Sequence, residues 1–199
     1  MRPVKEKRER ALGTKLFLKA ERCNSPKCAT VRKPQRPGVH GAKRRSVSEY
    51  GRQLQEKQKA RLIYGLTNKQ IENLFTKMSK EQILSRLEKR IDRVVFLLGL
   101  AKSPRISRQL VSHGHILVNN RKVRSPSFTV KIGDKIEIRP ESKKSKIFDE
   151  LSEYLKHHNP PDWMEMDKNE YRGVVTKEPA IDVYAISFNV DSVNEFYSR

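Results

Sequence analysis

The sequence predicts an α+β fold in which several helices precede a small antiparallel sheet, with a long basic segment in front of them. Three observations support this prediction. Apolar residues recur at helical intervals over residues 48–98. Two pairs of short apolar runs, each pair around a turn, follow over residues 116–138. The first 45 residues show neither period and carry a basic residue at nearly every second or third position.

The basic segment contains four prolines and little apolar surface. Residues 1–48 hold 15 Lys or Arg against 3 acidic residues. Such a segment cannot by itself offset the entropy lost on ordering. Two interpretations stay open: a disordered tail, or an arm that becomes ordered on RNA. The turn Arg36-Pro-Gly-Val-His-Gly favours the arm, because proline and glycine at set positions specify a defined turn.

Three amphipathic helices are expected next, over residues 48–65, 67–78 and 79–98. The second and third each open with a capping box, Thr-x-x-Gln and Ser-x-x-Gln. Gly65 and Gly99 stand where helix-ending glycines are common.

A short helix and two hairpins are expected after these helices. Ser103 and Pro104 are typical of an N-cap and a first helical residue, and Gly114 ends that helix. Asn119-Asn120 suits the tight turn of a first hairpin. Residues 128–130 and 135–138 flank a second turn and are expected to pair with each other.

The tail differs from the rest of the chain in charge. Residues 49–139 hold 20 Lys or Arg against 8 acids, whereas residues 140–199 hold 8 against 12. A helix is expected near residues 147–157, and strand-like runs lie near Val174 and residues 183–188. The acidic surplus suggests ordinary packing or a basic protein neighbour.

The net charge of +20 and the pI of about 10.1 indicate a polyanionic partner. Nucleic acid and anionic membrane are the two candidates. No apolar run approaches the length that spans a bilayer, and the N-terminus has no apolar stretch of the signal-peptide type. We therefore expect a cytoplasmic protein that binds nucleic acid and no membrane.

Arginines recur at helical spacing in two places, Arg86, Arg90 and Arg93, and then Arg105 and Arg108 with Ser112. His113 and His115 bracket the glycine between helix and sheet. A charged stripe is often just a solvated face. Together with the overall charge, however, guanidinium groups that can pair with phosphate favour an RNA-binding surface.

Catalytic interpretations have little support in the sequence. Cys23 has no accompanying His and Asn arrangement, and His157 and His158 are adjacent, so their side chains diverge on a helix. No glycine-rich phosphate loop is present. We therefore expect no enzyme activity.

Several motifs together resemble a known family. Residues 85–95 (SRLEKRIDRVV), 108–119 (RQLVSHGHILVN) and 130–136 (VKIGDKI) are similar to the S-four RNA-binding module. RNA-modifying enzymes, tRNA-charging enzymes and stand-alone RNA-binding factors also contain that module. The flanking stretches 15–29 (KLFLKAERCNSPKCA) and 52–66 (RQLQEKQKARLIYGL), with RPGVHG at 36–41 and EFYSR at the end, resemble only the ribosomal S-four family, of bacterial type.

The resemblance implies an arrangement and a role. It implies a mainly helical domain made from both ends of the chain, residues 46–85 with 141–199, an inserted module over 86–140, and an extended basic arm over 1–45. The implied role is primary binding of small-subunit ribosomal RNA at a helix junction of its 5′ domain, early in assembly. Family members also touch the S-five ribosomal protein, with an influence on decoding accuracy, and border the mRNA entry path.

The site expected from the stripes and the family motifs is an RNA-binding surface without catalytic residues. Its predicted members are Lys15, Lys19, Arg22, Arg36, His40, Lys43, Arg44, Arg45, Arg52, Lys57, Lys59, Arg61, Arg86, Arg90, Arg93, Ser103, Arg105, Arg108, Gln109, His113, His115 and Asn119.

Two cysteines, Cys23 and Cys28, correspond to half of a zinc site that many bacterial members carry. The Cys-x-x-Cys pair that supplies the other two ligands is missing, because residues 4–14 hold no cysteine. Two thiolates do not complete a tetrahedral site. His40 could be a third ligand, but its turn is expected to meet RNA. We expect no cofactor and no bound zinc.

Overall fold

The computed structural model describes residues 5–18, 20–23, 25–43, 46–179 and 187–198. The chain divides into two compact units, one made of residues 1–83 with 181–199 and the other of residues 84–180. Helices and one five-stranded antiparallel sheet confirm the α+β prediction. None of the helices in the described ranges has both the length and the apolar character needed to cross a bilayer.

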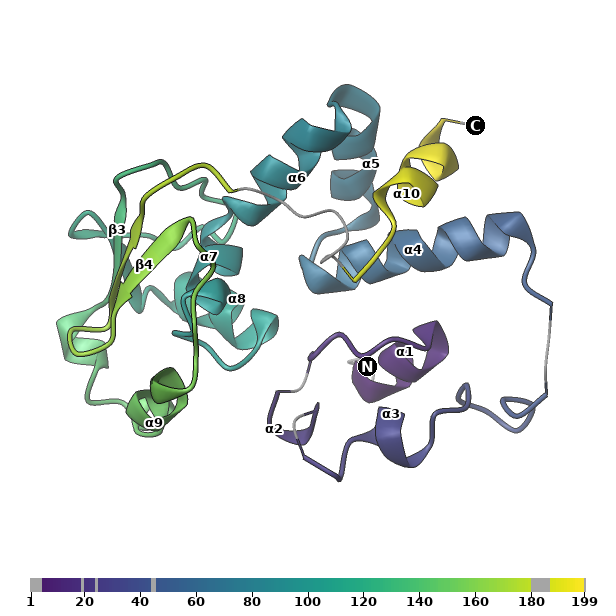
Figure 1. The fold of residues 1–199 in the computed structure, drawn as a ribbon, viewed down its shortest axis with the longest axis horizontal. Coiled ribbons are helices and arrows are strands. Elements are labelled where there is room, and N and C mark those ends of the chain that lie inside the picture. Colours follow the sequence, from purple (N-terminus) through teal and green to yellow (C-terminus); the bar gives the residue numbers. More distant parts are fainter. Residues whose placement is uncertain (1–4, 19, 24, 44–45, 180–186, 199) are drawn as a thin grey trace. The chain divides into compact units, whose positions relative to one another are not determined.

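The first unit is helical and uses both ends of the chain (Figure 1). Its helices are α1 (Lys5–Leu12), α2 (Ala20–Cys23), α3 (Ala29–Arg32), α4 (Glu49–Ile63), α5 (Asn68–Lys77) and α10 (Val190–Tyr197), and α6 (Lys80–Glu88) begins in it.

The packing of α10 on α4 and α5 forms the core of this unit. Val190 and Val193 are buried, and the Tyr64 and Phe188 rings meet edge to face with 6.2 Å between centroids. The predicted capping box of α5 is present in both halves at Thr67 and Gln70. Of the box predicted at Ser79, the Ser79 amide donates to Gln82 Oε1 at 3.4 Å. The Ser48 hydroxyl, which was not predicted as a cap, accepts from the Gly51 amide.

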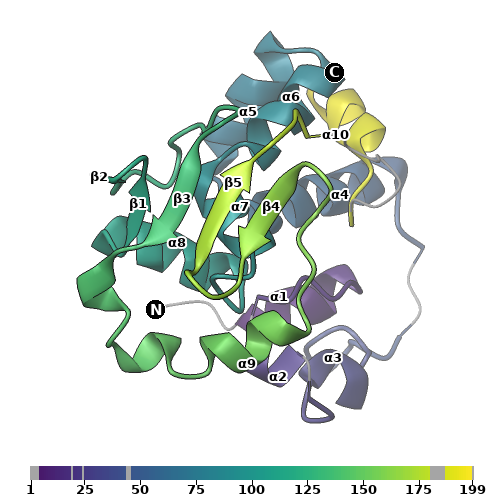
Figure 2. The same cartoon turned by 60° about the vertical axis from the view of Figure 1, so that its left-hand side comes forward.

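The second unit is built around the sheet, whose strand order is β2-β1-β3-β5-β4 (Figure 2). Its elements are α7 (Ile91–Leu97), α8 (Pro104–His113), β1 (Ile116–Val118), β2 (Arg121–Lys122), β3 (Lys135–Ile138), 3₁₀ turns at Pro140–Ser142 and Lys146–Phe148, α9 (Leu151–Lys156), β4 (Met164–Asp167) and β5 (Arg172–Val175).

Helices α7 and α8 lie against one face of this sheet (Figure 2). Alternate strand residues such as Ile116, Val118 and Ile136 point into that core, as the two-residue period of a strand requires. The predicted first hairpin is confirmed. Its turn residues Asn119 and Asn120 have φ of 50° and 63°, the backbone conformation of a type I′ turn.

One expected helix is interrupted. The apolar period of residues 79–98 predicted a single helix, but the structure has α6 and α7 separated at residues 89–90. The break occurs because the backbone there pairs with another segment: the Val130 amide donates to Lys89 O at 2.9 Å, and the Ile91 amide donates to Phe128 O at 2.8 Å. The interpretation that Arg86, Arg90 and Arg93 share one helix face is therefore wrong.

The same pairing corrects the second hairpin. Residues 128–130 do not pair with β3, because Thr129 forms a bridge with Arg90 instead. The strand β3 pairs with β1 on one side and β5 on the other.

The tail contributes more to the sheet than the sequence suggested. The predicted helix near 147–157 appears as α9, and the run near Val174 is β5, but β4 and the terminal helix α10 were not predicted. Most of residues 183–188 lies outside the described residues. Residues 141–179 group with the module, which differs from the expected division, because β5 hydrogen-bonds along the free edge of β3.

The basic segment contains regular structure that its composition did not reveal. Residues 5–12 form α1, and α2 and α3 follow as single turns. The Glu9 side chain of α1 is fully buried, and Leu16 and Leu18, which follow α1, are buried as well. Residues 33–43, in contrast, are almost all exposed and carry no helix or strand.

Candidate RNA-binding surface

Helix α8 presents polar side chains on one face and buries the other. Ser103 caps it by accepting from the Ile106 amide, and Gly114 ends it with φ of 74°. Leu110 and Val111 face the core. The outward residues are Arg105, Arg108, Gln109, Ser112 and His113. The helix therefore places its cationic side chains on one solvent-facing surface.

A buried carboxylate organises the arginines beneath this surface. Asp92 lies in the first turn of α7, is 6% exposed and receives both the Arg90 Nε, at 3.0 Å, and an Arg90 terminal nitrogen, at 2.8 Å. Arg108 Nη1 approaches the same carboxylate at 3.4 Å, while its side chain stays 41% exposed. Asp92 thus neutralises one buried arginine and orients a second at the surface.

Two histidines lie where α8 meets the sheet. The His113 and His115 rings have centroids 6.0 Å apart, and His115 Nδ1 is 2.9 Å from the Ser142 hydroxyl. Burial lowers the pKa of His115, and the charges of His113, Arg139 and Lys122 lower it further. Lys122 lies over Gly114, where an added Cβ would be 2.2 Å from Lys122 Cε. The cluster combines several hydrogen-bond donors in a small area.

The first hairpin extends this basic area. Arg121, Lys122 and Arg124 are exposed, and sequence reasoning missed all three. Their position directly after the Asn119-Asn120 turn was a usable signal, because a tight hairpin next to α8 must bring its second strand close to it. Asn119 itself accepts from the Lys135 amide at 2.9 Å and donates to Asp134 at 2.8 Å, so its amide group holds the turn.

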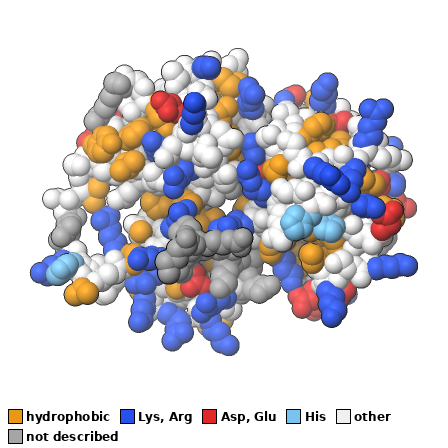
Figure 3. All heavy atoms as spheres, turned by 180° about the vertical axis from the view of Figure 1, so that it is seen from behind, with side chains coloured by type: hydrophobic (Ala, Val, Ile, Leu, Met, Phe, Trp, Pro, Cys, Tyr) orange, Lys and Arg blue, Asp and Glu red, His pale blue; other side chains and the backbone are white. Residues whose placement is uncertain are grey.

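Lys and Arg side chains are spread over the face drawn in Figure 3, with histidine side chains among them. Many of the predicted RNA-binding residues are exposed or partly exposed to solvent. They include Arg22, Arg36, His40, Lys43, Arg52, Arg86, Arg105, Arg108, Gln109, His113, His115 and Asn119. Lys19, Arg44 and Arg45 lie outside the described residues.

Other predicted residues are engaged inside the protein. Arg90 is 8% exposed, and Ser103 is 2% exposed with its hydroxyl used as a helix cap. Arg93 Nε donates to Glu88 at 3.0 Å. The structure gives these three residues internal partners, which phosphate groups would have to displace.

The same holds for the basic residues of α4. Lys57 Nζ lies 4.4 Å from the Phe196 ring centroid, and burial lowers the Lys57 pKa. Lys59 Nζ pairs with Glu56 at 2.6 Å. Arg61 Nη1 donates to Asn68 at 3.0 Å. Lys57 and Arg61 thus link α4 to α10 and to α5, whereas Lys59 pairs within α4.

The cysteine region does not suit zinc. Cys23 and Cys28 are both buried. The nearest carboxylate, Glu9, accepts from two backbone amides, and its oxygens are 3.8 and 4.0 Å from Cys23 Sγ. Within the described ranges no three His, Cys, Asp or Glu side chains converge as metal ligands would.

The Cys28 sulfur has other neighbours. Burial raises the Cys28 pKa, but donation from Thr30 and Val31 and the charge of Lys15 outweigh this effect, and the net pKa is lowered. Cys28 precedes α3 as its N-cap, so its position is explained by local packing.

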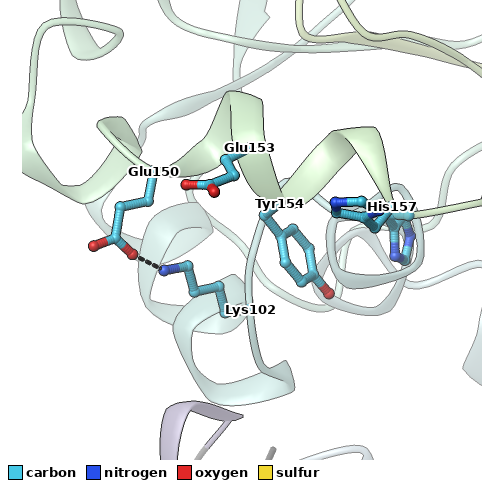
Figure 4. Close-up of a pocket in the computed structure, with 6 residues that line it drawn as sticks. Lys102, Glu150, Glu153, Tyr154 and His157 are labelled. Carbon is cyan, nitrogen blue, oxygen red and sulfur yellow. Dashed lines mark hydrogen bonds and ion pairs between the residues drawn. The ribbon is translucent and has the colours of Figure 1, made fainter.

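The second unit also has an open pocket, lined by residues of α9 and by Lys102, His157 and His158 (Figure 4). Lys102 reaches across it to Glu150, and Tyr154 stacks on His158 with 5.5 Å between centroids. His158 Nε2 is bonded to Leu97 O at 2.7 Å. The Lys102–Glu150 and His158–Leu97 contacts thus fasten the α9 segment to the end of α7 and to the loop that follows it.

Comparisons with known proteins show the family to which the chain belongs. Residues 2–92 match the Ribosomal protein S4/S9 N-terminal domain, and residues 89–136 match the S4 domain. The small ribosomal subunit protein uS4 of Pelotomaculum thermopropionicum is 44% identical over 193 residues, which cover 94% of this chain and 93% of that protein. The chain belongs to the uS4 family.

Other uS4 proteins give the same result. Those of Syntrophomonas wolfei and Thermus thermophilus are 42% and 43% identical over 194 residues, again with 94% of this chain and 93% of each relative covered. The uS4 family consists of structural ribosomal proteins, and the match spans both units of the chain. This membership separates the chain from the enzymes that contain only the S4 domain.

Proposed function

We propose that this protein is a structural constituent of the small ribosomal subunit that binds ribosomal RNA directly, early in assembly, at a helix junction of the 5′ domain. Membership of the uS4 family is the observation that carries the proposal. The exposed basic face of α8 and the neighbouring hairpin supply the chemistry, because Arg and Lys pair with phosphate and structured RNA is recognised largely through its backbone. Its place of action is then the cytoplasmic ribosome.

The experiment measures binding of the protein to a transcript of the 5′ domain at several salt concentrations. The logarithm of the affinity should fall steeply and linearly with the logarithm of salt. The variant Arg105→Gln should reduce the slope by about 1, as loss of one phosphate contact does. Lys168→Gln is a matched control in the acid-rich part of the tail. Salt-independent binding, or equal slopes for Arg105→Gln and the wild type, would contradict the proposal.

The proposed protein neighbour is the S-five ribosomal protein, with a joint influence on decoding accuracy, beside the mRNA entry path. The acid-rich tail supports a basic protein contact: Asp149, Glu153, Asp162 and Glu165 are exposed. Binding of purified S-five protein should weaken when Glu153 and Glu165 are changed to Gln. Unchanged binding would remove this surface from the contact.

A further inference from the structure

Phe17 has a backbone conformation that aromatic residues rarely adopt. Its φ is 54°, in the left-handed region, where a bulky side chain is a true outlier. Its neighbours Leu16 and Leu18 are 5% and 3% exposed, whereas Phe17 itself is 43% exposed. The chain therefore turns two leucines inward and one aromatic ring outward.

A buried carboxylate holds this conformation in place. Glu9 Oε1 accepts from the Leu16 amide and from the Leu18 amide, both at 3.0 Å. The two amides flank Phe17 and converge on one carboxylate oxygen. This arrangement is a nest, a backbone conformation whose N–H groups bind an anion. Because Glu9 is fully buried, releasing either amide would leave part of a buried charge unsatisfied.

The exposed ring is accompanied by a cation. Lys15 Nζ lies 5.1 Å from the centroid of the Phe17 ring. No other aromatic ring of the described residues packs on it. A strained backbone and a solvated aromatic ring both cost free energy. The hydrogen bonds to Glu9 hold the backbone conformation, but they do not explain why the residue at this position is an exposed aromatic one. Such strain is commonly found at sites of binding.

We propose that Phe17 and Lys15 form a stacking platform for an unpaired nucleobase of RNA, with the lysine directed to the adjoining phosphate. This inference rests on the proposed function. A nucleobase fits better than an apolar protein side chain, because residues 1–48 carry 15 basic against 3 acidic residues. Aromatic side chains beside basic ones are the usual means of binding unpaired bases.

Three variants separate the contribution of the Phe17 ring to RNA binding from its contribution to stability. Phe17→Leu removes the aromatic face and keeps an apolar side chain. Phe17→Gly also removes it, and its relief of strain should offset the greater entropy of its unfolded chain. Both should retain the stability of the wild type and bind the 5′-domain transcript about 5- to 100-fold more weakly, the effect of losing one base stack. Phe17→Tyr should bind like the wild type.

Val31→Ala serves as the control, since Val31 is another exposed apolar residue of the same segment, at 63%. Ultraviolet cross-linking of the wild type to the transcript, followed by mass spectrometry, should identify Phe17 as a cross-linked residue. Wild-type affinity in Phe17→Leu and Phe17→Gly, with no cross-link at Phe17, would overturn the inference and leave the proposed function intact. Failure of the wild type itself to bind would instead contradict the proposed function.

Discussion

At the scale of single residues, burial separates the exposed arginines, which we propose bind RNA, from the arginines that hold the fold. Arg90 and Arg105 were equivalent in sequence, since both stood in basic stripes. In the structure Arg90 pairs with buried Asp92, and Arg105 is exposed on α8. No pattern in the sequence distinguishes them, because the difference arises from the pairing of residues 89–91 with residues 128–130.

Arg90→Gln should lower the free energy of unfolding by about 3 kcal/mol, because it leaves the Asp92 carboxylate buried without its closest partner. Arg105→Gln should change the stability by no more than about 0.5 kcal/mol, as is usual for exposed positions. Urea denaturation of both variants checks this. Equal stabilities would show that the buried pair contributes little.

Tyr197 gives a second test at this scale. Its hydroxyl is buried without a partner among the described residues, and burial, followed by the charge of Glu72, raises the pKa of Tyr197 to about 12. Tyr197→Phe should therefore keep or increase stability at neutral pH. A raised pKa also means that the wild type loses stability as pH rises from about 10 towards 12.

The phenylalanine variant should not show that alkaline loss, since it has no phenol to ionise. Thermal unfolding of the two proteins between pH 8 and pH 11 measures the difference. A parallel decline in both would assign it to other groups.

His115 should make the stability depend on pH in the opposite direction, with a loss at acidic rather than alkaline pH. Because burial, with the charges of His113, Arg139 and Lys122, lowers its pKa below the ordinary value of 6.5, the unfolded chain binds this proton more readily. Stability should be full above pH 6.5 and fall as pH decreases below it. His115→Gln should reduce this acid dependence, whereas exposed His157→Gln should leave it as in the wild type.

At the scale of elements, the predictable parts were those fixed by local chemistry. The caps at Thr67 and Ser103 and the Asn119-Asn120 turn are set by hydrogen bonds within a few residues, and all three were predicted correctly. The break at residues 89–90, the strand β4 and the pairing of β5 with β3 depend on partners far along the chain. A single sequence does not reveal such pairings.

The candidate RNA-binding surface also has a part that could be predicted from the sequence and a part that could not. The exposed face of α8 followed from its helical period, whereas the contact of Lys57 with the Phe196 ring depends on how α4 packs on α10. The arrangement around Glu9 was not visible either, because a buried acid in a basic segment looks like any other surface charge in the sequence.

Ser103 allows a test of one element. Because its hydroxyl caps α8, Ser103→Ala should lower the free energy of unfolding by about 1 kcal/mol. Ser103→Asp should restore it, since aspartate also caps helices. If Ser103 instead contacted RNA, the Ser103→Asp variant would be stable but would bind RNA much more weakly. That outcome would show that Ser103 is part of the RNA-binding surface.

At the scale of the whole molecule, the charge of +20 and the acid-rich tail support the proposal of one surface for RNA and another for a protein neighbour. Residues 33–43 are nearly all exposed, while Glu9, Leu16 and Leu18 are buried. Amides of residues 33–43 should therefore exchange rapidly in the free protein and slowly in the small subunit. The amides of Leu16 and Leu18 should be protected in both states.

The most direct test of the central claim is a cryo-electron microscopy structure of small ribosomal subunits purified from cells that produce this protein. The account predicts the chain on the 5′ domain of the ribosomal RNA, with Arg105 and Arg108 of α8 and the basic hairpin residues within hydrogen-bonding distance of phosphate oxygens. A subunit in which the chain is present but α8 faces solvent, or one from which the chain is absent, would contradict it.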